Sequence, residues 1–385
     1  MIAKGGSGNQ SHSKVTVMAH QTSRPRSSHP RTSHSRTSGS WRAVPIALLA
    51  ATALALAGCS SSDDGATGTS AGSSPVLATT SIWADVTRHV ACDEVEVASL
   101  IPRGADAHEF APSVQDADAL RSAELVVANG LGLEEGLHDA LDTASSDGVT
   151  VLEVGPDLQP LAADGHAADD EHGGKDEHAD EGEHADEGEH ADEEHDHGDE
   201  DPHVWMDPER VADAVPLIAA ALAEVDDLGV PADRLEACAE EYAASLRELS
   251  ADMEQTLAVV AEPQRRLVTN HEALGYFADR FDFTVVGAAV PSTSSLGESN
   301  PRELDELAAT MREEGVRAVF AETTSPTDLA DALADQVGGD VQVVELYTES
   351  LGDEGSGAST YVEMMTTDAA RVAEALGTGT PGAGQ

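Results

Sequence analysis

The stretch PADRLEACAEEYAASLRELSADMEQTLAVVA, residues 231–261, decides the fold because it predicts one long helix between two halves of the chain. Ala, Leu, Glu and Arg, which favour helices, make up most of it. About 30 residues at 1.5 Å per residue give a helix of roughly 45 Å, long enough to run along two lobes. A shorter predicted helix, 207–225, precedes it. We expect the long helix to restrict hinge motion between the lobes.

On both sides of this helix, short runs rich in β-branched residues alternate with longer amphipathic runs, as in βα units built around parallel sheets. The predicted strands are 76–82, 95–101, 125–129 and 149–154 in the first half, and 266–270, 284–290, 318–321 and 341–346 in the second. The predicted helices are 83–91, 113–122 and 134–144, then 272–280, 300–314, 326–336 and 360–376. We therefore predict an α/β fold of two lobes, each a four-stranded, mainly parallel sheet flanked by helices.

The start of the chain has the features of a bacterial lipoprotein signal peptide. Residues 1–58 contain Lys and Arg but no Asp or Glu, and the apolar run 43–57 is shorter than the roughly 20 residues that span a bilayer. The run ends in Leu-Ala-Gly-Cys, which resembles a lipobox and would leave Cys59 as the lipid-bearing first residue. The alternative is an ordinary cleavage site with an incidental cysteine. With lipid on Cys59, the mature protein is secreted and anchored to the outer face of the cytoplasmic membrane.

One internal segment, 162–201, consists almost entirely of Asp, Glu, His, Gly and Ala. Because it has no apolar side chain larger than alanine, it cannot bury enough surface to offset ordering entropy, and we predict a disordered loop. Its histidines lie among carboxylates and form a candidate auxiliary metal-binding loop: His166, His172, His178, His184, His190, His195 and His197. The alternative is an acidic insert that only keeps the protein soluble.

These segments predict the domain organisation. At 385 residues the chain exceeds a typical single domain, which also favours two lobes. The predicted parts are a signal peptide 1–58, a flexible tether 59–74, an N-terminal lobe 75–226 containing the loop, a linking helix 227–262, a C-terminal lobe 263–376 and a disordered tail 377–385. Cys92 and Cys238 remain after lipidation; the oxidising compartment permits a disulfide, with two unpaired buried thiols as the alternative.

The charge limits the possible partners. The formal net charge is −51, from 72 acidic and 21 basic residues. Nucleic-acid binding needs clustered Lys and Arg, so this composition argues against it and is compatible with attracting cations.

Three histidines are distinguished by their local context. His108 lies in the loop after the second predicted strand, His203 lies where the acidic loop ends and a helix begins, and His271 directly follows the fifth predicted strand. Ligands of open α/β sheets bind at the carboxyl ends of the strands. Two facing lobes would therefore bring these loops together across a cleft.

A carboxylate from the second lobe would complete a four-coordinate site. Glu349 follows the last predicted strand and is the predicted fourth ligand, with Asp353 and Glu354 as alternatives. Three imidazoles and one carboxylate suit Zn²⁺, which takes nitrogen and oxygen ligands tetrahedrally, whereas an oxygen-rich shell favours Mn²⁺. We predict a zinc site in the inter-lobe cleft, with manganese as the alternative.

The chain is similar to the zinc- and manganese-binding receptors of ABC importers, the ZnuA/TroA-like family, over about residues 75–376. The matching segments are GADAH (104–108), NGLGLE (129–134), DPHVW (201–205), NHEALGY (270–276) and TESL (348–351). In that family the first, third and fourth segments each present a metal-binding histidine, which the resemblance places on His108, His203 and His271. Manganese-binding members commonly have Glu where this chain has His271, which agrees with zinc. The last family ligand is usually Asp rather than Glu349, and a water is the alternative that completes the shell.

This resemblance implies a monomeric solute-binding lipoprotein that captures Zn²⁺ outside the cell and presents it to the permease of an ABC importer. Zinc-binding members often carry a His- and acid-rich loop before the Asp-Pro-His segment, as here. We expect no enzymatic activity, because the sequence has neither a His-Glu-x-x-His helix nor a Gly-x-Ser-x-Gly elbow. The alternatives are a manganese receptor, a zinc metallochaperone and a surface adhesin, with a zinc hydrolase least favoured.

Overall fold

The computed structural model describes residues 74–163, 200–339 and 341–377, all within one compact unit, Gly65–Gln385. These residues form two four-stranded sheets in which every strand pairing is parallel. The two-lobed α/β fold predicted from the sequence is confirmed. Within this part of the chain, no helix has the length and apolar character needed to cross a membrane. Cys59 and all seven histidines of the acidic loop lie outside the described residues.

The first lobe contains a sheet with strand order β2-β1-β3-β4. Its strands are β1 (Val76–Ala78), β2 (Val97–Ser99), β3 (Leu125–Ala128) and β4 (Thr150–Glu153). Its helices are α1 (Ser81–Val90), α2 (Val114–Ser122) and α3 (His138–Ser146). The two central strands, β1 and β3, are fully buried, which accounts for their unbroken apolar sequences.

The second lobe contains the sheet β6-β5-β7-β8, an order equivalent to that of the first. Its strands are β5 (Arg266–Thr269), β6 (Thr284–Ala288), β7 (Ala318–Glu322) and β8 (Gln342–Leu346). Its helices are α6 (Gly275–Phe281), α7 (Pro301–Glu314), α8 (Asp328–Val337) and α9 (Tyr361–Leu376). The loops that carry His108, His271 and Glu349 leave the carboxyl ends of β2, β5 and β8.

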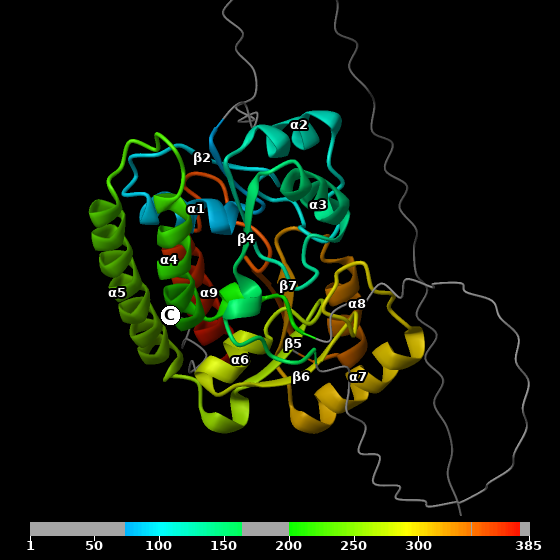
Figure 1. Ribbon diagram of the computed structural model, residues 1–385. Helices are drawn as coiled ribbons and strands as arrows, with labels where there is room; N and C mark the ends of the chain where they lie inside the picture. Colours follow the sequence, from blue (N-terminus) through cyan, green and yellow to red (C-terminus); the bar gives the residue numbers. More distant parts are fainter. Residues whose placement is uncertain (1–73, 164–199, 340, 378–385) are drawn as a thin grey trace, which may run out of the picture. The chain divides into compact units, whose positions relative to one another are not determined.

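Two successive helices join the lobes, α4 (Pro208–Ala223) and α5 (Ala232–Leu257). With 26 residues, α5 is about 39 Å long at 1.5 Å per residue, somewhat shorter than the stretch predicted from sequence. It packs against α4, α1 and α9, so it contacts a helix of each lobe (Figure 1). The predicted linking helix is therefore present in the structure.

The start of α1 differs from the prediction, which extended the first strand to residue 82. The Thr80 side chain accepts a hydrogen bond from the Trp83 backbone nitrogen at 3.2 Å and caps the helix. Thr, with a β-region backbone, is a favoured N-cap residue, so the chain leaves the strand after Ala78 and the helix begins at Ser81. This places Ser81 at the edge of the inter-lobe site described below.

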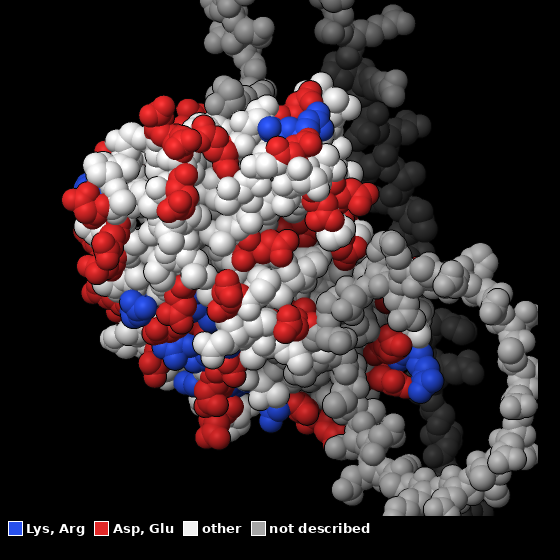
Figure 2. Space-filling view, in the orientation of Figure 1, with Lys and Arg blue, Asp and Glu red and all other residues white. Residues whose placement is uncertain are grey.

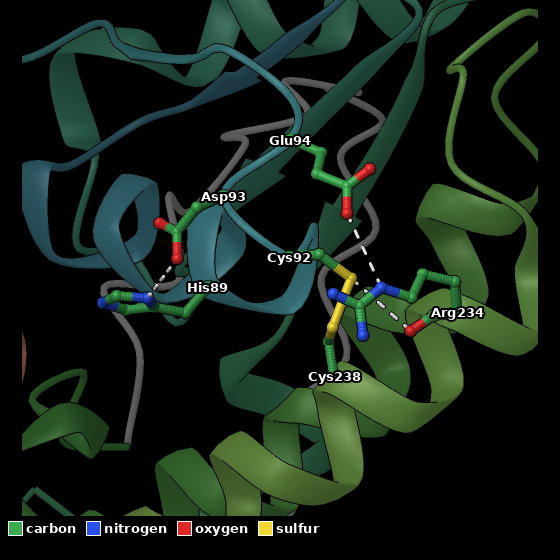
Figure 3. Close-up of a disulfide and its surroundings, with 6 residues drawn as sticks. All are labelled: His89, Cys92, Asp93, Glu94, Arg234 and Cys238. Carbon is green, nitrogen blue, oxygen red and sulfur yellow. Dashed lines mark hydrogen bonds and ion pairs between the residues drawn. A yellow bond between two sulfur atoms is a disulfide. The ribbon is translucent and has the colours of Figure 1, made fainter.

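A disulfide joins the far end of α1 to the linking helix. Cys92, just after α1, is bonded to Cys238 on α5, with the Cα atoms 5.6 Å apart (Figure 3). Beside it, Arg234 Nε lies 3.5 Å from Glu94 Oε1, an exposed ion pair between the same two segments. The structure thus resolves the alternative left open by the sequence in favour of a covalent bond.

Candidate metal centre

The four predicted ligands converge on one point between the lobes. His108, His203, His271 and Glu349 are all buried, and one candidate ligand atom of each lies within 4.8 Å of the others. His203 Nε2 is 3.5 Å from His108 Nε2, 3.1 Å from His271 Nε2 and 3.4 Å from Glu349 Oε1. A tetrahedral Zn²⁺ with bonds of about 2.1 Å has its ligand atoms about 3.4 Å apart. The spacing of the four side chains therefore fits a single small cation.

Short turns set the backbone positions of two of these histidines. The His108 backbone nitrogen donates to Asp106 Oδ1 at 2.9 Å, and the His203 backbone nitrogen donates to Asp201 Oδ1 at 2.9 Å. Each is an Asx-type turn, in which an aspartate two residues earlier orders the local chain. The repeated Asp-x-His pattern therefore has a structural reason.

Two imidazoles are also oriented through their side chains. His203 Nδ1 lies 2.7 Å from Asp201 Oδ1, and His271 Nδ1 contacts Glu322 Oε1. When Nδ1 carries the proton and donates it to a carboxylate, the lone pair of Nε2 is free for a metal. His108 Nδ1 has no hydrogen-bond partner among the described residues. Sequence reasoning did not identify Glu322, although it ends strand β7 and so lies at the same sheet edge as the ligand loops.

The pKa values of the three histidines and Glu349 depend on burial and on their charges acting on one another. Burial alone would lower the pKa of His203, but the carboxylates of Glu349 and Asp201 outweigh burial and raise it. Burial lowers the pKa of His108 to about 3, so this imidazole is neutral at physiological pH. Burial would raise the pKa of Glu349, but the adjacent histidines lower it. The group thus combines an ionised carboxylate with imidazoles that can lose their protons to a metal.

The surroundings of Glu349 favour a bound cation. It is 2% exposed, yet neither of its carboxylate oxygens accepts a hydrogen bond within the described part of the chain. Its close neighbours are the imidazoles of His203 and His271, at 3.4 and 3.7 Å from Oε1, and a coordinated cation would compensate for the solvation that the carboxylate loses on burial. Asp353 and Glu354, the alternatives to Glu349, are exposed on the loop beyond it and are absent from the convergent group.

A cavity of about 840 Å³ borders His108. Its lining includes Glu135 and Glu153 of the first lobe, Glu200, and a second-lobe segment that contributes Ser292, Thr293, Ser294, Leu296 and Gly297. Carboxylates in a hollow focus a negative potential that raises the local concentration of cations. Figure 2 shows Asp and Glu at many places on the visible face and fewer Lys and Arg.

Comparisons with known proteins agree with this fold. The sequence model of the family described as "Zinc-uptake complex component A periplasmic" matches residues 76–375, and the chain belongs to this family. It is a substrate-binding protein of a metal ABC transporter, a class of receptors that work with a membrane permease and are not enzymes.

Individual relatives differ in the metal that their names report. The manganese-binding lipoprotein MntA of Halalkalibacterium halodurans is 30% identical over 313 residues, covering 81% of this chain and 91% of that protein. The zinc-binding protein TroA of Treponema pallidum is 26% identical over 309 residues, covering 78% and 88%. Among solved structures, the periplasmic zinc-binding protein TroA of Treponema pallidum aligns with a TM-score of 0.64 at 24% identity, over 78% of this chain and 98% of that one. This structural similarity supports the fold.

Proposed function

We propose that the protein is an extracytoplasmic zinc receptor that binds one Zn²⁺ through His108, His203, His271 and Glu349 and delivers it to an ABC-type permease. The observation that carries the proposal is the donor set at the convergent point. It offers three imidazole nitrogens and one carboxylate, buried together at separations close to a tetrahedral edge. Zinc accepts such a mixed shell, and the ion would tie the first lobe to the second.

Manganese is the second candidate, because a relative named as manganese-binding is 30% identical. Mn²⁺ prefers oxygen ligands, often in six-coordinate shells. Here nitrogen supplies three of the four donors, and two of those imidazoles are fixed by the carboxylates of Asp201 and Glu322. The donor chemistry therefore favours zinc over manganese.

The proposed location is the outer face of the cytoplasmic membrane, with lipid on Cys59. Several relatives are named as lipoproteins, which supports this placement. We further propose that the histidines of the acidic segment hold additional zinc weakly. Deleting residues 164–199, which leaves Asp201 in place, should lower the number of zinc ions bound but retain one tight site.

A competition titration with Zn²⁺ and Mn²⁺ tests the proposed selectivity, comparing the wild type with His271→Glu. The substitution replaces an imidazole by a carboxylate, so we expect weaker zinc binding and a shift of preference toward manganese. A wild-type protein that binds manganese more tightly than zinc, or a His271→Glu variant with unaltered preference, would contradict the assignment.

A further inference from the structure

The loop that carries Glu349 is held in place by the opposite lobe. This loop, residues 347–360, connects β8 to α9, and we call it the Glu349 loop. The Glu349 carboxylate lies 3.4 Å from His203 Nε2 and 3.7 Å from His271 Nε2 but accepts no hydrogen bond from a described residue. Contacts of the loop backbone therefore contribute to its position.

Arg103 forms hydrogen bonds with both sides of the Glu349 loop, at Gly352 and Ser359. Its Nη1 atom donates to the carbonyl oxygens of Gly352 at 2.7 Å and Ser359 at 2.9 Å. The two sides of the loop also bond to each other here, because Gly352 N donates to Ala358 O at 2.9 Å. One guanidinium nitrogen thus links the two sides of the loop. Arginine suits this role because it stays protonated and its charge strengthens each hydrogen bond.

Neighbouring contacts reinforce the same junction. Gly104 N donates to Ser350 Oγ at 2.8 Å, and Leu351 N donates to Ser81 Oγ at 3.0 Å. The hydroxyls of Ser81 and Ser350 are 3.1 Å apart. Residues 350–352, directly after Glu349, are therefore all bonded to first-lobe atoms.

The geometry links two ligands of the proposed site. Arg103 and Gly104 lie on the same loop as His108, and their acceptors lie on the same loop as Glu349. Arg103 is exposed, so its contacts can break without unfolding either lobe. Loss of the Arg103 contacts would loosen the Glu349 loop, although Ser81 and Gly104 still bind it. The three histidines would stay in place.

We propose that Arg103 is a positioning residue that sets how long the metal stays bound, by fastening the Glu349 loop to the loop that carries His108. The inference rests on the proposed function, since it requires a metal held by Glu349. It predicts that Arg103 acts on metal dissociation far more than on association or on the stability of the metal-free fold.

The test measures zinc dissociation into excess chelator by stopped flow, for the wild type, Arg103→Gln and Arg103→Lys. We expect Arg103→Gln to dissociate about tenfold faster, the size of effect that one charge-assisted hydrogen bond can produce. Arg103→Lys should recover part of the loss, because a single ammonium can still donate to both carbonyls. Arg121→Gln is the matched control: Arg121 is an exposed first-lobe arginine paired with Asp118 on α2, and its removal should change the rate by less than about twofold.

A double-mutant cycle with Glu349→Gln separates positioning from general loosening. If Arg103 acts through Glu349, Arg103→Gln should add little to the dissociation rate of Glu349→Gln. An Arg103→Gln rate equal to that of the wild type, or an effect fully retained beside Glu349→Gln, would overturn the inference.

Hydrogen exchange of the metal-free protein tests whether Arg103 holds the Glu349 loop, and it does not require the protein to bind zinc. Arg103→Gln should speed exchange at the amides of residues 350–359 and leave the sheets unchanged. Failure of the wild type to bind zinc tightly would refute the proposed function, whereas unchanged exchange in these amides would refute the role of Arg103.

Discussion

Removing the Cys92–Cys238 disulfide should destabilise the fold without affecting the metal centre. The bond closes a loop with a sequence separation of 146 residues. In the chain-entropy model, closing a loop of this length lowers the conformational entropy of the unfolded chain, which raises its free energy by about 5 kcal/mol at 25 °C. The folded state is stabilised relative to the unfolded state by the same amount. The double variant Cys92→Ser/Cys238→Ser should approach this loss, and serine preserves the size of each side chain. The left-handed backbone at Cys92, with φ of 62°, is no more strained for serine than for cysteine.

The assay is urea unfolding of the metal-free, soluble mature domain, followed by circular dichroism. We expect a lower midpoint for the double variant, and the same midpoint for the wild type after full reduction. Zinc affinity should change little, because the disulfide lies at the opposite end of α1 from Ser81, about 15 Å away at 1.5 Å per residue over ten residues.

Two outcomes would refute this reasoning. Titration of the denatured, unreduced wild type could reveal two free thiols, which would mean that the bond does not form. Alternatively, equal unfolding free energies of the oxidised and double-variant proteins would mean that the cross-link does not constrain the unfolded chain.

Three further predictions concern buried ionisable groups. Asp368 is fully buried, and burial raises its pKa to about 8, although the Tyr347 backbone hydrogen bond and the charge of Arg371 oppose this rise. Because this folded-state pKa lies above the unfolded value, the contribution of Asp368 to stability falls as pH rises from about 4 to 8. In urea unfolding, Asp368→Asn should therefore gain on the order of 4 kcal/mol more at pH 8 than at pH 5, and an equal gain at both would contradict this. Glu322→Gln weakens the fixation of His271 and should lower zinc affinity by about 10- to 100-fold by competition titration; unaltered affinity would show that this carboxylate does not orient the ligand. The pKa of His203 is raised in the metal-free protein, so zinc binding at neutral pH should release protons and weaken as pH falls; calorimetry in buffers of different ionisation enthalpy would count them, and the absence of proton release would contradict a histidine shell.

The parts of the fold that depend on local sequence could be predicted. The apolar runs predicted as strands 125–129 and 318–321 lie in the buried central strands β3 and β7, and the glycine-free stretch after Pro231 forms α5. Strand ends also gave His108, His271 and Glu349, because parallel sheets gather such loops at one edge. The predicted boundaries failed where a side chain intervened, as when Thr80 capped α1.

Features that depend on tertiary contacts could not be predicted. Arg103 and its acceptors Gly352 and Ser359 are 249 and 256 residues apart, and no local pattern indicates that they meet. The pairing of Cys92 with Cys238 depends on how α1 packs against α5. Glu322 lies one residue beyond the predicted strand 318–321, and its contact with His271 depends on the order of the strands in the sheet.

Anomalous diffraction from crystals grown with equimolar Zn²⁺ and Mn²⁺ would identify the bound metal and its ligands. We expect one strong peak at the zinc absorption edge, within about 2.2 Å of His108 Nε2, His203 Nε2, His271 Nε2 and a Glu349 carboxylate oxygen. A peak at the manganese edge instead, or a zinc ion bound elsewhere while these four side chains hold none, would contradict it.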